Sequence, residues 1–300
     1  MRFSFWPIAR QSWDDVLTLA RHVEVTGWDG IWYADHFMPN TPDASDPCHE
    51  VWTTVAALAA CVPRVRIGSL VAGNTYRHPA VVANMAATID RLSGGRLVLG
   101  LGAGWQENEH HAYGIEFYTV GERLRRLEEA CQVIKALFCE RRANFDGRYY
   151  RLENAPLEPK PLQDPLPLMI GGGGEKVTLR IVARYADEWN VWGDVDRLRQ
   201  KMDVLDRHCE AVGRDPVAIQ RSAAVLVYLS DDRDLVKRIR EEPQARPSIA
   251  GNAAELAEII AEYSQAGVDE LIVPDFHMAL GTAKTEFLDR FIEEVAPAAR

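Results

Sequence analysis

The sequence has no long apolar run, no excess of positive charge and no cysteine pattern typical of a disulfide or zinc framework. No apolar stretch reaches the roughly eighteen residues that a membrane-spanning helix needs. Lys and Arg total 34 against 44 Asp and Glu, and the net charge of -10 argues against nucleic acid or an anionic membrane surface as the main partner. The cysteines are odd in number and lack a C-x-x-C, so we expect reduced thiols.

The amino-terminal stretch, residues 1–15, turns polar early, so we expect neither a signal peptide nor a membrane segment. These absences favour a cytoplasmic protein whose ligands are small molecules.

Short apolar runs alternate with amphipathic segments along the chain. The predicted strands are 2–7, 30–36, 65–73, 96–104, 167–174, 187–193, 220–230 and 269–277. The predicted helices are 13–26, 51–61, 80–92, 121–138, 176–186, 195–212, 253–266 and 285–295. This alternation is typical of an α/β fold, the parallel (β/α)₈ TIM barrel, and residues 1–300 suit one such domain. We expect rim excursions at 139–166, which is rich in proline, and at 231–250, which is charged and expected to be mobile.

In such a barrel the chemistry lies at the carboxyl ends of the strands. The residues there are Trp6, Asp35, His36, Ala72, Gly73, Asn74, Gly102, Gly104, Trp105, Gly171, Gly172, Gly173, Gly174, Trp192, Asp275 and His277. An isolated Asp35-His36 pair can be a strand-end cap, but its convergence with glycyl, polar and aromatic residues favours a functional role. Trp6, Trp105 and Trp192 suit the wall of a pocket for a flat ring system.

The stretch "LMIGGGGEKVTLRI" joins an apolar strand to a helix through four glycines. Glycines let backbone N–H groups approach an anion, and Lys176 and Thr178 add donors, so this stretch resembles a phosphate cradle. The alternative is a flexible turn that merely needs positive φ. Glu175 must point away from a phosphate, toward a ribityl hydroxyl or a backbone N–H.

The stretch "GLGAGWQENEHHAYG" lacks the G-x-G-x-x-G spacing of a dinucleotide site, and we interpret it as close backbone approach to a planar ligand, with Asn108 and Glu109 in the next turn. His110 and His111 are adjacent, so on a helix they point about 100° apart and cannot share one metal ion. We therefore expect no metal site.

Together these stretches resemble the luciferase-like flavin monooxygenase superfamily, and within it the oxidoreductases that use the deazaflavin coenzyme F420. The matching stretches are "GWDGIWYADHF", "IGSLVAGNTYRHPAVVANMAATIDRLSGGRLVLGLGAGWQENEHHAYG", "GERLRRLEEACQVIKALF", "FDGRYYRL" and "LMIGGGGEKVTLRIVARYADEWN". They span nearly the whole chain in the family's order, and the combination is more specific than any one part.

The resemblance implies that Asp35 approaches a cofactor ring over the strand ends and that His36 acts near the substrate on a proton or through a hydrogen bond. Ser69, Leu70, Val71 and Ala72 match the family segment behind the ring, which often contains a non-proline cis peptide. Other expected cofactor contacts are Asn74, Gly104, Asn108, Gly172, Gly173, Gly174, Glu175, Lys176 and Thr178. Flavin mononucleotide (FMN) and F420 both bind in this groove in the family, so the resemblance leaves open which of the two cofactors this protein uses.

We therefore expect an oxidoreductase that moves hydride between a small organic substrate and C5 of F420, with His36 managing the proton. The alternatives are an FMN monooxygenase with a partner flavin reductase, a metal-dependent barrel hydrolase, and a non-catalytic flavin- or phosphate-binding barrel. A homodimer is a further expectation. A cis peptide, or a β-bulge, is predicted within residues 69–72, with Ser69–Leu70 as the favoured bond, because a regular strand would project a side chain into the ring's space.

Overall fold

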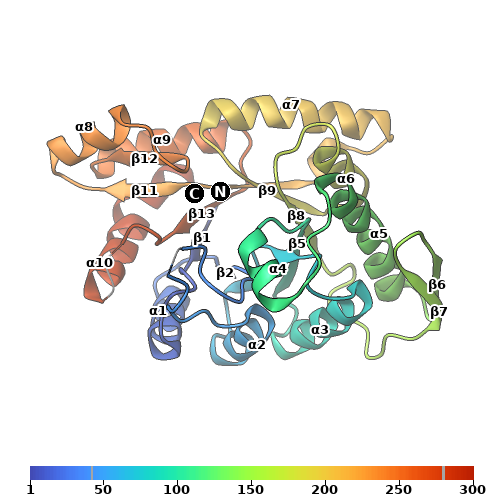
Figure 1. The fold of residues 1–300 in the computed structure, drawn as a ribbon. Helices are drawn as coiled ribbons and strands as arrows, with labels where there is room; N and C mark the ends of the chain where they lie inside the picture. The colour runs from blue at the N-terminus through green and yellow to red at the C-terminus, as the bar shows by residue number, and fades with distance from the viewer. Residues whose placement is uncertain (42, 279–280) are drawn as a thin grey trace.

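The computed structural model describes residues 1–41, 43–278 and 281–300, and its central feature is a closed parallel barrel (Figure 1). The barrel strands in the described chain are β1 (Arg2–Trp6), β2 (Gly30–Tyr33), β3 (Arg66–Ser69), β4 (Ala72–Gly73), β5 (Leu97–Gly102), β8 (Leu168–Gly171), β9 (Glu188–Trp192), β10 (Gln220–Ala224) and β13 (Glu270–Pro274). Their order is β3-β2-β1-β13-β10-β9-β8-β5-β4, and pairing of β3 with β5 closes the ring. Because β3 and β4 occupy one position, the predicted (β/α)₈ TIM barrel is confirmed.

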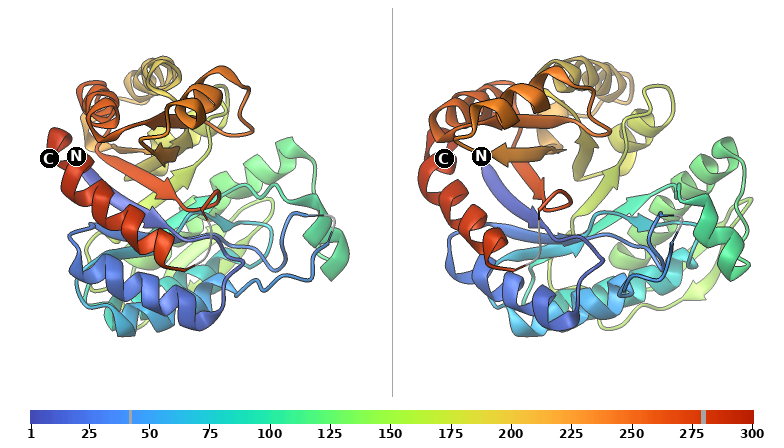
Figure 2. Two further views of the ribbon diagram at one scale, coloured as in Figure 1. Left: turned by 90° about the vertical axis from the view of Figure 1, so that its left-hand side faces the viewer. Right: turned by 60° about the vertical axis from the view of Figure 1, so that its left-hand side comes forward.

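Helices surround the strands (Figure 2). Those in the described chain are α1 (Trp13–Val25), α2 (Val51–Cys61), α3 (Pro79–Leu92), α4 (Glu107–Tyr113), α5 (Val120–Cys139), α6 (Thr178–Tyr185), α7 (Val195–Ala211), α8 (Arg233–Glu241), α9 (Ala253–Gln265) and α10 (Thr282–Arg290), with a π-helical turn at Phe291–Val295 and 3₁₀ turns at Pro216–Ala218 and Ala296–Ala299. Sequence signals set several starts: the Ser12 side chain accepts a hydrogen bond from Asp15 N–H, and Asn252 and Glu255 form a capping box. None of the helices in the described ranges is long and apolar enough to cross a bilayer.

The two ends of the barrel differ. The Met1 ammonium donates to the Ala299 carbonyl at 2.7 Å, and both termini lie at the end opposite α4 (Figure 2). Inside the barrel near the termini, Arg66 forms ion pairs with Glu188 and Glu270, and Glu270 also accepts a hydrogen bond from Trp32 Nε1 at 2.8 Å. This paired cluster fills the amino-terminal end, so the space for a ligand lies at the carboxyl end.

The third barrel strand, predicted over residues 65–73, is interrupted between β3 and β4. A cis peptide joins Leu70 to Val71, so the prediction of a cis bond within residues 69–72 is confirmed, but the favoured bond, Ser69–Leu70, is wrong. Ser69 still pairs with Tyr33 of β2, and Leu70 N–H donates to the Tyr33 carbonyl at 2.8 Å. The regular pairing with β2 therefore continues one residue further than expected.

The excursion at residues 139–166 contains an antiparallel hairpin that the sequence analysis did not predict, formed by β6 (Ala143–Asp146) and β7 (Arg151–Ala155). It lies at the edge of the molecule opposite β11 and β12 (Figure 1).

The segment 231–250, expected to be mobile, contains helix α8 and most of strand β12 (Ser248–Gly251). Strand β12 pairs in parallel with β11 (Leu226–Leu229), so the predicted strand 220–230 divides into a barrel strand and a strand of a separate two-stranded sheet. The charged segment is therefore structured, and its strand extends the chain that leaves barrel strand β10.

Candidate active site

A cavity of ≈ 770 Å³ opens at the carboxyl ends of the barrel strands. Its lining includes most of the residues expected at a site: Trp6, Asp35, His36, Leu70, Val71, Ala72, Gly104, Trp105, Gly172, Gly173, Thr178 and Trp192. The carboxyl ends of the strands therefore bring together residues that are far apart in the sequence.

Six expected contact residues are not part of the lining: Ser69, Asn74, Asn108, Gly174, Glu175 and Lys176. Gly174 and Lys176 are outside the cavity, and α6 begins at Thr178, so these two residues belong to the turn before the helix.

Four of these residues, Ser69, Asn74, Asn108 and Glu175, have hydrogen-bond partners within the protein. Ser69 Oγ donates to the Gly100 carbonyl at 2.8 Å, and Asn74 Nδ2 donates to Tyr150 Oη at 3.2 Å.

The side chain of Asn108 accepts the hydrogen bond of the next backbone N–H at 2.9 Å, within its own turn of helix. Glu175 accepts a hydrogen bond from Lys201 Nζ at 2.7 Å, which holds the pKa of Glu175 below its usual value.

The floor of the cavity is backbone and small side chains. A Cβ at Gly102 or Gly171 would lie 2.7 or 2.8 Å from a Val71 methyl, so a larger residue at either position would displace Val71. Gly104 has φ of +82°, a conformation that glycine adopts without the cost to other residues. The floor thus carries no large side chain at these positions and is mainly apolar, which suits a planar ring system.

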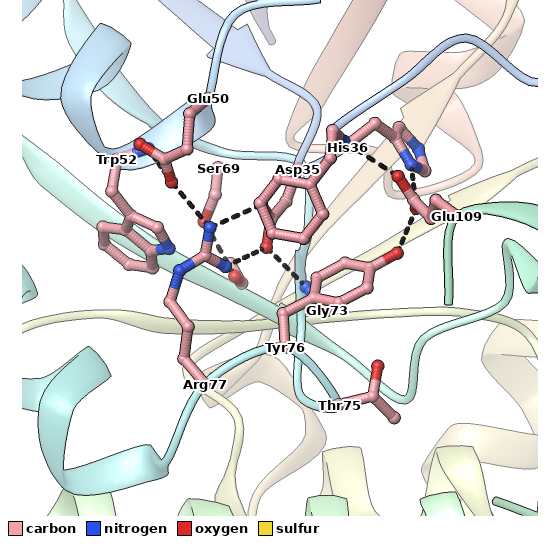
Figure 3. A network of polar contacts seen from close by, with 12 residues as sticks. Asp35, His36, Glu50, Trp52, Ser69, Gly73, Thr75, Tyr76, Arg77 and Glu109 are labelled. Carbon is pink, nitrogen blue, oxygen red and sulfur yellow. Dashed lines mark hydrogen bonds and ion pairs between the residues drawn. The ribbon is translucent and has the colours of Figure 1, made fainter. Parts of the chain in front are cut away.

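Asp35 lies buried beside this floor in an ion-pair network (Figure 3). Arg77 binds both of its carboxylate oxygens, at 2.7 and 3.2 Å, and Gly73 N–H donates to it at 3.0 Å. Arg77 also pairs with Glu50 at 2.6 Å. Burial raises the pKa of Asp35 and Arg77 opposes that rise. Asp35 thereby fixes the segment around Gly73, which forms one side of the cavity.

His36 lines the cavity and is held from behind by Glu109 of helix α4 (Figure 3). His36 Nδ1 lies 2.8 Å from Glu109 Oε1, and the other carboxylate oxygen accepts Phe37 N–H at 2.8 Å. Tyr76 Oη donates to Glu109 as well. Burial raises the pKa of Glu109, but these hydrogen bonds outweigh it and hold the pKa below its usual value.

The tautomer of His36 follows from this arrangement. An ionised carboxylate only accepts hydrogen bonds, so His36 Nδ1 must carry a proton and donate it to Glu109. Nε2 forms no hydrogen bond within residues 1–41, 43–278 and 281–300. A neutral His36 therefore has its lone pair on Nε2, and the geometry suits a general base whose imidazolium form Glu109 stabilises.

Aromatic side chains form another wall of the cavity. Trp6 packs edge-on against Phe276 with ring centroids 4.9 Å apart, and Trp192 lies 5.5 Å from Trp6. The Arg246 guanidinium lies 4.6 Å from the Trp192 ring centroid, and burial lowers the pKa of Arg246. Trp105 packs edge-on against the His36 ring at 5.4 Å. This wall combines flat apolar surface with positive charge.

Two further strand-end residues, Asp275 and His277, are not part of the cavity lining. Asp275 is buried, accepts Ile8 N–H at 2.6 Å and forms an ion pair with the buried Lys284. His277 Nε2 donates to the Val227 carbonyl at 3.1 Å. Both therefore connect rim segments to each other.

The sequence analysis missed Arg77 and Tyr76 and gave Glu109 no role, although all three act on the Asp35-His36 pair. It also missed Asn190 and Arg246 of the cavity lining. No local signal identifies Arg77 in "NTYRHP", because arginine is common in loops of every kind. Among the described residues, no group of three or more His, Cys, Asp and Glu side chains is placed to hold a metal ion.

Comparison with known proteins gives consistent matches. The model of the luciferase-like monooxygenase family matches residues 1–270. An F420-dependent glucose-6-phosphate dehydrogenase of Kineococcus radiotolerans is 30% identical over 94% of this chain and 91% of its own. An uncharacterised protein of Mycobacterium tuberculosis is 31% identical over 59% of this chain and 64% of its own.

Solved structures share the fold over the full length. An F420-dependent secondary alcohol dehydrogenase, in complex with an F420-acetone adduct, superposes with a TM-score of 0.86 at 22% identity, covering 100% of this chain and 99% of that one. A long-chain alkane monooxygenase superposes with a TM-score of 0.81 at 15% identity, covering 99% and 90%.

Proposed function

The chain belongs to the luciferase-like monooxygenase family, and on that premise we propose that it is an oxidoreductase that transfers hydride between a small organic substrate and coenzyme F420. Relatives that match nearly the whole chain are named as F420-dependent, which favours this cofactor over FMN. The observation that carries the proposal is His36, fixed in one tautomer by the buried Glu109 beside a flat glycine-rich floor.

The residues of the cavity fit such a cofactor. The backbone of Val71, Gly102 and Gly171 leaves a flat surface for a three-ring system, with Asp35 and Ala72 beside it. Gly172, Gly173 and Thr178 are proposed to hold the cofactor's side chain and phosphate, together with Asn74, Gly104, Asn108, Gly174, Glu175 and Lys176 at or beyond the rim. Bound F420 supplies a carbon that accepts or returns hydride.

The protein's contribution is the proton. When an alcohol is oxidised, its C–H bond breaks as hydride leaves and its O–H proton goes to His36 Nε2, so that a carbonyl forms. Glu109 then faces an imidazolium and stabilises it by charge and hydrogen bond. In the reverse direction His36 returns the proton to the carbonyl oxygen.

The substrate is proposed to lie against Trp6, Trp105 and Trp192. Arg197 and Arg246 line the same cavity, and neither forms an ion pair within the described ranges of the chain. Such cations favour a substrate that carries a carboxylate or phosphate. The name of the Kineococcus relative agrees with this class.

The second candidate is a monooxygenase that uses reduced FMN supplied by a flavin reductase. The alkane monooxygenase structure, at a TM-score of 0.81, shows that the fold is shared with a monooxygenase. A cytoplasmic location and a homodimer remain predictions from the sequence.

Titration of the purified protein with F420 and, separately, with FMN tests the proposal. We expect F420 to bind in the micromolar range or tighter, and His36→Ala to lower turnover by roughly 10²- to 10⁴-fold with little change in F420 affinity. Exposed His111 on α4 provides the control, His111→Ala. Tight binding of FMN alone would favour the monooxygenase, and full turnover in His36→Ala would remove the proposed base.

A further inference from the structure

Asn190 lies in the middle of strand β9, at the base of the cavity beside the glycine turn. It is aligned with Gly171 of β8 on one side and with Ser222 of β10 on the other. Its carbonyl accepts Gly172 N–H at 2.9 Å. The residue is 5% exposed and lines the cavity. A ring resting on the glycine floor would therefore cover Asn190.

The orientation of the Asn190 amide follows from its neighbours. Ser222 Oγ lies 3.1 Å from the Trp189 carbonyl oxygen. Because a carbonyl oxygen can only accept, the Ser222 hydroxyl donates its proton to this hydrogen bond. Ser222 Oγ must then accept from the side chain of Asn190, 2.9 Å away, which requires Asn190 to present its NH₂ group. Oδ1 is left to face the cavity, with no hydrogen bond to any residue that the structure describes.

We propose that Asn190 Oδ1 accepts a hydrogen bond from the N–H of the cofactor's pyrimidine ring, and that Ser222 positions the amide for it. The proposal rests on the proposed function for the presence of a ring in this cavity. An acceptor at the base of the cavity recognises a ring N–H lying between two carbonyls, an edge that F420 and FMN share. Oδ1 accepts no hydrogen bond from any residue that the structure describes, so it is free to accept one from such a ring N–H, shielded from water once the ring covers it.

The test measures the dissociation constant for F420, by quenching of its fluorescence, in five proteins. They are the wild type, Asn190→Leu, Ser222→Ala, the double variant, and Asn84→Leu as the control on the exposed face of α3. Asn190→Ala replaces Asn190→Leu where the larger side chain prevents folding, and thermal melting of each cofactor-free protein reports on folding.

We expect Asn190→Leu to weaken F420 binding by about 3- to 10-fold, the usual value of one hydrogen bond. Ser222→Ala should weaken it less, and the double variant should match Asn190→Leu, because Ser222 acts only through Asn190. Asn84→Leu should bind like the wild type.

Unchanged F420 affinity in the folded Asn190 variant, whether Asn190→Leu or its replacement Asn190→Ala, overturns the proposal. Additive effects of the Asn190 and Ser222 substitutions overturn the positioning role of Ser222. If the wild type binds FMN but not F420, the F420 function fails, yet the same series with FMN still tests Asn190. If the wild type binds neither F420 nor FMN, both the proposed function and the proposed role of Asn190 are overturned.

Discussion

Replacing Glu109 by Gln tests the arrangement on which the proposed chemistry depends. Phe37 N–H can only donate, so the amide oxygen of the introduced glutamine would take the place of the carboxylate oxygen that now accepts it. The NH₂ group would then face His36 Nδ1, where Glu109 now accepts at 2.8 Å. The imidazole of His36 must then change tautomer, so that Nδ1 accepts the hydrogen bond from the glutamine NH₂ group and Nε2 carries the proton.

The size of the effect follows from the lost charge-assisted hydrogen bond. Such a bond contributes about 2 kcal/mol, which corresponds to a roughly 30-fold change in the ratio of the two tautomers. Only the tautomer protonated on Nδ1 can take a proton at Nε2. Turnover should fall by at least about 30-fold, toward the roughly 10²- to 10⁴-fold of a lost general base, while F420 affinity stays within about twofold.

Nuclear magnetic resonance of ¹⁵N-histidine-labelled protein reads the tautomer of His36 without a substrate, and F420 reduction measures turnover. Glu107→Gln is the matched control, because Glu107 lies on the same helix, its side chain is 63% exposed, and its carboxylate is 3.8 Å from His111. A Glu109→Gln protein that keeps the proton on Nδ1 and turns over like the wild type would refute the reasoning.

Three further predictions concern the cradle, the ion pair and the response to acid. Gly173→Asp should abolish cofactor binding in the titration, and Lys176→Glu should weaken binding less because Lys176 lies outside the cavity lining. If both variants bind the cofactor as tightly as the wild type, the phosphate lies elsewhere. Arg77→Met should lower the free energy of unfolding in urea by about 3–5 kcal/mol, because Asp35 stays buried without its partner, and a loss below about 1 kcal/mol would contradict this. Burial lowers the pKa of His277, so the unfolded chain binds the His277 proton more readily than the folded chain, and stability falls as the pH drops through about 6.5. The melting temperature of His277→Gln should therefore fall less than that of the wild type between about pH 7 and 5. An equal fall in both proteins would assign the effect to other groups.

The order of strands and helices could be predicted because each element carries its own signal in the sequence. Apolar runs, caps and turn glycines act locally, so the barrel follows from them. The break in the third strand was placed one bond too early, because its position depends on the fit of Val71 against Gly102 and Gly171, which are distant in sequence. Helix α8 was missed because its face is mostly charged and only Val236 is buried.

The site was predicted to the extent that it consists of strand ends. Asp35, His36 and the glycine turn could be placed on one rim from the fold alone. Their partners could not, since Arg77 lies 42 residues after Asp35 and Glu109 lies 73 residues after His36. An acid or a base at such a separation has no local signature, and only the folded barrel shows which one faces the pair.

The whole chain is negatively charged, whereas the cavity lining carries more positive than negative charge. The chain carries a net charge of -10, which keeps polyanions away from most of its surface. The cavity lining contains Arg197 and Arg246, which have no ion pair in the described chain, and Arg10, which pairs with Asp46 at 3.1 Å; its one carboxylate, Asp35, is offset by Arg77. Field lines from these arginines are concentrated in a cleft with apolar walls, so a small anion is attracted there and repelled elsewhere. An anionic cofactor and an anionic substrate would both be guided to the end of the barrel where His36 lies, and raising the ionic strength should slow the association of F420 more than that of an uncharged deazaflavin.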